Sequence, residues 1–432
     1  MPTFTDVACT VCGCVCDDLR VTVEGQKITQ AVGACGLAEP WFLGQDAESP
    51  PAAEIDGRSA ALEAALDRAA KILSAARAPL VYGLSRSSTA GQRAAVRLAD
   101  RIGATIDTTA SLCHGPSIIA LQQVGESTCS LGEIKNRADL VIYWGSNPMV
   151  SHPRHIERYG ADPIGMFVPE GRAGRTLVVV DTEPTATTAL ADVFLQVEPG
   201  RDFDVLWALR ALVAGKDLST ATSATDGVAA NDFGAPLAAL EQLAGRMKAC
   251  RVGVVFFGLG LTQSGVGHLS VEALLRLVTD LNDYTRFHAK RMRIPGDVAG
   301  ADSVLCWQTG YPFAVNLARG YPRYNPGEYS ANDVLEQGEA DACVLVGSDG
   351  TSALSKEAQQ NLARLPIIAL DAPTVITAPS PTVRFTTAVY GIHRAGTAYR
   401  MDEVPIPLRA ILTTQYQSDA EVLRQLIARL PG

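Results

Sequence analysis

A chain of 432 residues, with 47% apolar and 19% charged residues, is long enough for about three domains with large buried cores. Its net charge of −9 argues against a nucleic-acid or anionic-membrane partner, because contacts to phosphates require a basic surface. No stretch approaches the roughly 20 apolar residues that cross a bilayer, and the N-terminus has neither the basic start nor the apolar run of an export signal. We therefore expect a cytoplasmic protein.

The N-terminus is rich in cysteine: half of the ten cysteines lie within the first 35 residues. Cys9, Cys12 and Cys16 have the spacing C-x2-C-x3-C, and a strand-like stretch after them could return the chain so that Cys35 adds a fourth thiolate. Soft thiolates are the usual ligands of iron–sulfur clusters, so the pattern favours a [4Fe–4S] cluster. Tetrahedral zinc and merely packed cysteines are the alternatives. Cys14 adds a thiol whose role the spacing leaves open.

Beyond this region, short apolar strands alternate with helices, which indicates parallel sheets covered by helices on both faces. We expect a cysteine-rich module over residues 1–50, followed by doubly wound α/β domains over 51–215 and 216–432. The polar segment 222–232 is predicted to be a surface loop or inter-domain joint. The predicted helices cover 60–76, 90–102 and 203–214, and the predicted strands cover 79–83, 140–144, 176–181, 252–258, 342–347 and 367–370.

A cysteine and a histidine, Cys113 and His114, stand together before Gly-Pro, where a tight turn could present a thiolate at a sheet edge. An imidazolium lowers the pKa of a neighbouring thiol, so a nucleophilic cysteine is one interpretation. A buried cysteine beside an exposed histidine is the other, because adjacency in sequence does not ensure contact between side chains.

Several predicted strands end in glycine, asparagine or aspartate. Glycine and Asn-Pro turns can direct backbone amides at an anionic ligand, and an acid at a strand end often binds a ribose hydroxyl. Each signal is weak by itself, since such residues also form plain turns. The candidate cofactor-binding residues at these strand ends are Gly145, Asn147, Pro148, Asp181, Gly258 and Gly260.

The order of these motifs is specific: a cysteine cluster, then Cys113-His-Gly-Pro-Ser, then Trp144-Gly-x-Asn-Pro, then a strand ending in Asp181. This order resembles the molybdopterin oxidoreductase superfamily, which includes formate dehydrogenases. The chain more closely resembles the B-type subunits of formylmethanofuran dehydrogenase over essentially its whole length. The longest matching phrases are Pro322–Glu328 and Gly396–Arg400.

The resemblance implies the first three domains of a formate dehydrogenase/DMSO reductase-like fold, without the C-terminal β-barrel that covers the pterins in single-chain relatives. It implies that Cys9, Cys12, Cys16 and Cys35 hold a [4Fe–4S] cluster. It also implies a molybdenum or tungsten bis(pterin guanine dinucleotide), with Cys113 as a ligand of the metal.

Other roles also follow from the resemblance. His114 would shuttle a proton, Arg293 would stabilise a carboxylate at the substrate site, and Gly396 and Thr397 would contact the cofactor. The chain would interconvert carbon dioxide and formate within a complex. Its partners would be a formyl-hydrolysing subunit, a β-barrel subunit covering the pterin, and further structural or electron-transfer subunits.

Three departures from the family pattern fall on the side expected to bind the pterin. Glu183 stands where the superfamily often has arginine, Asp349 is not followed by the usual proline, and Ala395 replaces a common acid. The alternative is therefore a non-redox scaffold subunit of a bacterial formyltransferase/hydrolase complex that has lost the pterin. Retention of the cysteines together with His114 and Arg293 favours the redox subunit.

Overall fold

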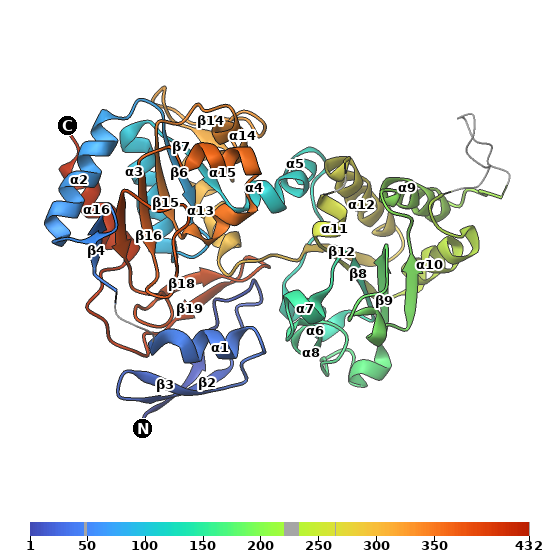
Figure 1. Cartoon of the computed structure of the whole chain (residues 1–432). Helices are drawn as coiled ribbons and strands as arrows, with labels where there is room; N and C mark the ends of the chain where they lie inside the picture. Colours follow the sequence, from blue (N-terminus) through green and yellow to red (C-terminus); the bar gives the residue numbers. More distant parts are fainter. Residues whose placement is uncertain (47–49, 220–232, 264, 432) are drawn as a thin grey trace. The chain divides into compact units, whose positions relative to one another are not determined.

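The chain folds into two compact units, called unit 1 and unit 2 below (Figure 1). Unit 1 combines Met1–Leu112 with Arg293–Gly432, and unit 2 is the continuous stretch Cys113–Met292. The sequence-based boundaries after residues 50 and 215 do not coincide with this division, because unit 1 is built from two separated stretches. The computed structural model describes residues 1–46, 50–219, 233–263 and 265–431, so the predicted loop at 222–232 lies outside the described residues.

The N-terminal part of unit 1 is a three-stranded antiparallel sheet followed by a short helix. The β2–β3 hairpin turns at Gly25, whose φ of +62° favours glycine. This hairpin reverses the chain after the cysteine loop and leads it to Cys35. The elements are β1 (Thr3–Val7), β2 (Leu19–Glu24), β3 (Lys27–Val32), α1 (Ala38–Leu43) and the 3-10 turn η1 (Gly44–Asp46).

The main sheet of unit 1 has nine strands in the order β14-β13-β7-β6-β15-β16-β17-β4-β5. Its parallel centre consists of β7 (Thr105–Thr108), β6 (Pro79–Gly83), β15 (Ala342–Val346), β16 (Ile367–Asp371) and β17 (Val383–Thr386). The strand order reverses between β6 and β15, and ligands bind at such switch points in open parallel sheets. The antiparallel edges are β13 (Val315–Asn316), β14 (Arg323–Tyr324), β4 (Ala53–Ile55) and β5 (Arg58–Ser59).

Every residue of β6, β15 and β16 is buried, which requires cover on both faces of the sheet. One face packs against α2 (Leu62–Ala75), α3 (Thr89–Ile102), α13 (Val298–Thr309) and α16 (Asp419–Arg429). The other packs against α14 (Ala331–Glu336) and α15 (Lys356–Leu362) (Figure 1). The hairpin of β18 (Gly396–Tyr399) and β19 (Pro405–Leu408) shares an apolar cluster with the cysteine loop, and η4 (Ser348–Ala353) follows β15.

Unit 2 contains a five-stranded parallel sheet in the order β10-β9-β8-β11-β12, so its switch point lies between β8 and β11. The strands are β8 (Leu140–Trp144), β9 (Thr176–Asp181), β10 (Val193–Gln196), β11 (Val252–Phe257) and β12 (Arg286–Arg291).

Helices lie on both sides of this sheet (Figure 1). The apolar core on one face includes α5 (Gly115–Val124), α9 (Asp202–Val213), α10 (Leu237–Ala249) and α12 (Gly267–Leu281). The other side carries α6 (Leu131–Arg137), α7 (Pro148–Ser151) and α8 (His155–Arg158). Short turns complete the chain: α4 (Ala110–Cys113), α11 (Leu259–Thr262), η2 (Gly171–Gly174) and η3 (Thr188–Leu190).

The predicted alternation of parallel strands and helices is confirmed. The strands predicted over 79–83, 140–144 and 176–181 begin and end at those residues. The other predicted strands and helices are present, with ends shifted by one or two residues. Among the described residues, no helix combines the length and the apolar character needed to cross a membrane.

A buried hydrogen bond offers a test of the unit 2 core. Trp144 is fully buried, and its Nε1–H donates to Asp202 Oδ1 at 2.7 Å. Trp144→Phe removes the donor and leaves a largely buried carboxylate, so we expect the free energy of unfolding to fall by about 1–3 kcal/mol in urea titrations. The control Trp207→Phe alters a side chain that is 46% exposed. Equal losses in the two variants would contradict the role given to this bond.

Candidate functional site

The switch point of unit 2 brings together the three glycines predicted to contact a cofactor. Gly145 follows β8 with a φ of +53°, and its carbonyl accepts the Gly260 N–H at 3.0 Å. Gly258 N–H donates to the Trp144 carbonyl at 3.1 Å. A Cβ on Gly145 would lie 2.8 Å from Leu261 N. The two turns therefore meet backbone to backbone, and side chains at these glycines would separate them.

Asn147 and Pro148 begin α7 at the same edge of the sheet. Asn147 Oδ1 accepts a hydrogen bond from Thr187 Oγ1 at 2.7 Å, and Thr187 is fully buried. Pro148 is buried at the first helical position, where its missing N–H leaves no bond unmade. Asn147 is thus held in place by its own neighbours.

Asp181 is the last residue of β9, and its carboxylate accepts the Thr182 N–H at 2.8 Å. Burial raises the pKa of Asp181, the Thr182 N–H opposes this shift, and the negative charge of Glu183 adds to it. Two acids therefore share this sheet edge. The edge can accept hydrogen bonds from hydroxyls, but it is unfavourable for a pyrophosphate.

Cys113 and His114 form the turn between α4 and α5. The Cys113 side chain is half-buried, and its carbonyl accepts the Thr262 hydroxyl at 2.9 Å. His114 is 1% exposed, so the exposed histidine considered as an alternative is wrong. Its Nε2 lies 2.9 Å from the Met292 carbonyl, which only accepts, so Nε2 carries a proton; Nδ1 lies 3.1 Å from Ser117 Oγ. The imidazole is therefore oriented through both ring nitrogens.

Arg293 belongs to unit 1, whereas Cys113 and His114 belong to unit 2. The Arg293 guanidinium is buried and pairs with Asp302, which also accepts the Thr108 hydroxyl at 2.8 Å. The Arg293 carbonyl accepts the Gly13 N–H at 3.0 Å. A Cβ on Gly13 would lie 2.2 Å from that carbonyl oxygen. Arg293 is thus packed directly against the cysteine loop.

The cysteine loop closes through a bond from Cys9 N–H to the Cys16 carbonyl at 2.8 Å. Burial raises the pKa of Cys9 well above its usual value, and negative charge on Cys12, Cys16 and Cys35 raises it further. The four predicted ligands are therefore close enough to influence one another. Within the described part of the chain, however, no three Cys, His, Asp or Glu side chains are arranged so that they could hold a metal ion.

Cys14 has a definite place in this loop. Hydrogen bonds to Cys12 and Cys16, together with complete burial, raise its pKa well above the usual value. The bond from Cys14 is the main cause that lowers the pKa of Cys12. Cys14 is therefore a thiol donor to its neighbours in this structure, and the donor set as a whole has the soft-ligand chemistry of an iron–sulfur site.

Gly396 and Thr397 lie in β18 of unit 1, beside the N-terminus of α3. The Thr397 carbonyl accepts the Thr89 hydroxyl at 3.0 Å, and a Cβ on Gly396 would meet Ser88 Cβ at 3.4 Å. These two residues are thus in a different unit from the glycines that follow β8 and β11.

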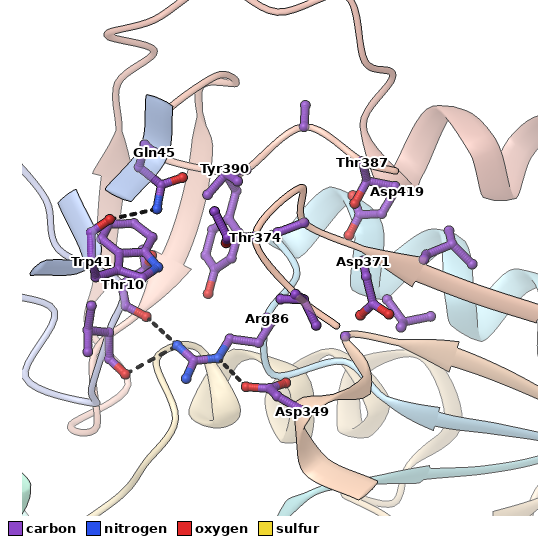
Figure 2. Close-up of a pocket in the computed structure, with 18 of the residues that line it drawn as sticks. Thr10, Trp41, Gln45, Arg86, Asp349, Asp371, Thr374, Thr387, Tyr390 and Asp419 are labelled. Atoms are coloured by element: carbon purple, nitrogen blue, oxygen red, sulfur yellow. Dashed lines mark hydrogen bonds and ion pairs between the residues drawn. The ribbon is translucent and has the colours of Figure 1, made fainter. Parts of the chain in front are cut away.

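The switch point of unit 1 opens onto a cavity of about 230 Å³ that the sequence analysis missed (Figure 2). Its wall includes Arg86 after β6, Asp349 after β15, Thr10 of the cysteine loop, and the aromatic rings of Trp41 and Tyr390. Glycines that end the predicted strands 79–83 and 342–347 are the sequence signal that could have located it. Strand order, which places these two ends side by side, is not visible in a single sequence.

Asp107 is a further residue that sequence reasoning missed. It lies in the buried strand β7 and accepts hydrogen bonds from Ser111 Oγ at 2.6 Å, Ala331 N–H at 2.7 Å and Ala314 N–H at 2.9 Å. The bond to Ser111 positions α4, whose last residue is Cys113. Burial raises the pKa of Asp107 to about 6.

Comparison with known proteins gives two full-length relatives and one solved structure, and no protein-family model matches the chain. The B-type subunit of a tungsten-containing formylmethanofuran dehydrogenase 2 from Methanocaldococcus jannaschii is 39% identical over 434 residues, 98% of each chain. The corresponding B-type subunit from Methanococcus maripaludis is 37% identical over 439 residues, 100% of this chain and 99% of the relative. A structure of the formyltransferase/hydrolase complex FhcABCD from Methylorubrum extorquens, in complex with methylofuran, matches with a TM-score of 0.69. It is 26% identical and covers 88% of this chain and 98% of that one.

The contact between the glycine turns predicts a large effect of a single methyl group. Gly145→Ala places a Cβ against Leu261 N in a left-handed conformation, so we expect the free energy of unfolding to fall by at least about 1–2 kcal/mol. The control Gly245→Ala, inside α10 with no atom within 4 Å of the new Cβ, should raise it by about 0.5–1 kcal/mol. Denaturant titrations measure both, and a neutral Gly145→Ala would show that the turns do not need this approach.

The buried carboxyl of Asp107 predicts a pH effect. Native Asp107 keeps its proton up to about pH 6, whereas its ordinary pKa is 3.8, so the unfolded chain releases this proton first and stability falls as the pH rises between these two values. Relative to Asp107→Asn, the unmodified chain should lose up to about 3 kcal/mol between pH 4 and pH 7. Urea titrations across that range test this, and a pH-independent difference would exclude the raised pKa.

Proposed function

This chain belongs to the family of formylmethanofuran dehydrogenase B-type subunits, and on that premise we propose that it is the redox subunit of such a complex. The proposed reaction is the interconversion of carbon dioxide and formate in one-carbon metabolism. The observation that carries the proposal is identity of 39% and 37% over essentially the full length of both chains. Every candidate ligand named above therefore lies in the region that is matched to the Methanococcus maripaludis relative.

The proposed [4Fe–4S] cluster would be held by Cys9, Cys12, Cys16 and Cys35. Their mutual effects on the pKa of Cys9 and the closed loop from Cys9 to Cys16 support this donor set. Cys14 would keep its place as a hydrogen-bond donor to sulfur, and such bonds help to set the reduction potential of a cluster.

The proposed tungsten or molybdenum bis-pterin would take Cys113 as its protein ligand, because a half-buried thiol on a tight turn offers a soft donor. When bound, the two groups supply the chemistry that moves two electrons between formate and carbon dioxide. The glycine turns after β8 and β11 would let backbone amides approach the cofactor, with Asn147, Pro148 and Asp181 at the same edge. Gly396 and Thr397 would contribute from unit 1.

Within this proposal, His114 and Arg293 have separate tasks. His114 would orient the Cys113 turn, and its Nε2–H, now given to the Met292 carbonyl, is the proton it could move. Arg293 would stabilise the formate carboxylate, and Asp302 keeps its guanidinium in position until then.

The proposed partners are the other subunits of the complex: a formyl-hydrolysing subunit, a β-barrel subunit that covers the pterin, and structural or electron-transfer subunits. The relatives named above are subunits of multisubunit enzymes, which supports partners of this kind. We propose a cytoplasmic location, since formate and carbon dioxide are small diffusible substrates. A scaffold role without the pterin is less well supported, because identity to the formyltransferase/hydrolase complex is 26% against 39%.

Metal analysis of the anaerobically purified complex tests the proposal. Plasma mass spectrometry should find about one tungsten or molybdenum and about four iron atoms per chain. Cys113→Ala should lose the tungsten or molybdenum and the formate-dependent reduction of viologen dyes but keep iron. Cys9→Ala should lose iron, because a cluster ligand is missing.

The matched control is Cys306→Ala, since Cys306 is an exposed thiol outside the candidate site. Both metals and activity should be retained in this variant. Iron without tungsten or molybdenum in the unmodified complex would leave a cluster-bearing relic, and absence of both would leave the scaffold role.

A further inference from the structure

Arg86 stands between the cysteine loop and the cavity of unit 1. It follows β6, and its Nη1 donates to the carbonyls of Thr10 and Val11 at 3.2 and 3.3 Å. These two carbonyls belong to the residues between Cys9 and Cys12. One guanidinium group thus holds the backbone that separates two of the proposed cluster ligands.

The opposite side of the guanidinium faces a carboxylate. Arg86 Nε donates to Asp349 Oδ2 at 2.8 Å, as Figure 2 shows, and Asp349 comes from η4 after β15. Gly347 makes room for this pair, because a Cβ there would lie 2.9 Å from Arg86 Cβ. Both side chains are only about one-third exposed, so the positive charge is kept in one place.

The charges of Arg86 and the loop already affect one another. Burial works to lower the pKa of Arg86, but the negative charges of Asp349, Tyr390 and Cys9 outweigh it and raise that pKa. Arg86 in turn contributes to the lowered pKa of Cys12, after the larger effect of Cys14. Its field therefore reaches sulfur on both sides of Thr10 and Val11.

We propose that Arg86 is a positioning residue for the iron–sulfur site: it holds the Thr10–Val11 backbone and places a permanent positive charge beside Cys9 and Cys12, which raises the reduction potential of the cluster. This inference rests on the proposed function. Reduction adds one electron, and so one negative charge, to a cluster that four thiolates already make negative. A nearby cation stabilises the reduced form more than the oxidised form. Arginine stays charged at any working pH, so the effect is constant.

The counter-ion gives the proposal a second, opposite sign. Asp349 offsets part of the Arg86 charge, so neutralising Asp349 should make the cluster easier to reduce. Neutralising Arg86 should make it harder to reduce. Local unfolding would not produce opposite shifts for the two partners of one ion pair.

The test is a redox titration of the anaerobic complex with dithionite, followed by the electron paramagnetic resonance signal of the reduced cluster. We expect Arg86→Gln to shift the midpoint potential to a more negative value and Asp349→Asn to shift it to a more positive one. Arg86→Lys, which keeps the charge, should shift it less than Arg86→Gln. The control is Arg409→Gln, because exposed Arg409 also donates to a backbone carbonyl of the N-terminal module, that of Thr5 at 2.9 Å.

Shifts of Arg86→Gln and Asp349→Asn no larger than that of Arg409→Gln, or shifts of the same sign, would overturn the proposal. If Arg86→Gln loses iron, the sign of the Asp349→Asn shift decides. Iron analysis of the unmodified complex separates this inference from the function it rests on. Absence of iron there would refute the proposed cluster itself, whereas a normal cluster with unshifted variants would refute only the role of Arg86.

Discussion

The parallel pairing of β6 with β15 is the interaction on which the rest of unit 1 depends. It joins Pro79–Gly83 to Ala342–Val346, two stretches separated by the whole of unit 2. The pairing completes the sheet, buries both strands and creates the switch point. Arg86 and Asp349 follow these two strands, so their ion pair is a direct result of the pairing. The cavity beside the cysteine loop exists for the same reason.

The chain passes between the units at residues 112–113 and 292–293, and the proposed catalytic residues stand at these passages. Cys113 and His114 are the first residues of unit 2, and Arg293 is the first residue of the returning segment. Each is held by bonds within its own unit: His114 to the Met292 carbonyl, and Arg293 to Asp302. The proposed reactive groups are thus supported by buried contacts on both sides of the passages.

The sequence predicts the elements of this fold better than their assembly. Strands such as 79–83, 140–144 and 176–181 are buried on both faces, so they form continuous apolar runs with clear ends. The division into units depends instead on which distant strands pair, and no local pattern carries that information. The burial of His114 and the position of Arg86 were missed for the same reason, since both are set by partners far away in sequence.

The insertion of unit 2 into unit 1 also determines the order in which the chain can fold during synthesis. All strands of unit 2 have been made by Arg291, and the His114–Met292 bond can then tie its two ends together. Unit 1 starts first but must wait for β15 before β6 gains its second neighbour. On the ribosome, β6 and β7 therefore spend the synthesis of an entire unit with an open apolar edge, the state most prone to aggregation. The cysteine loop, made first of all, meets Arg293 only after unit 2 is complete.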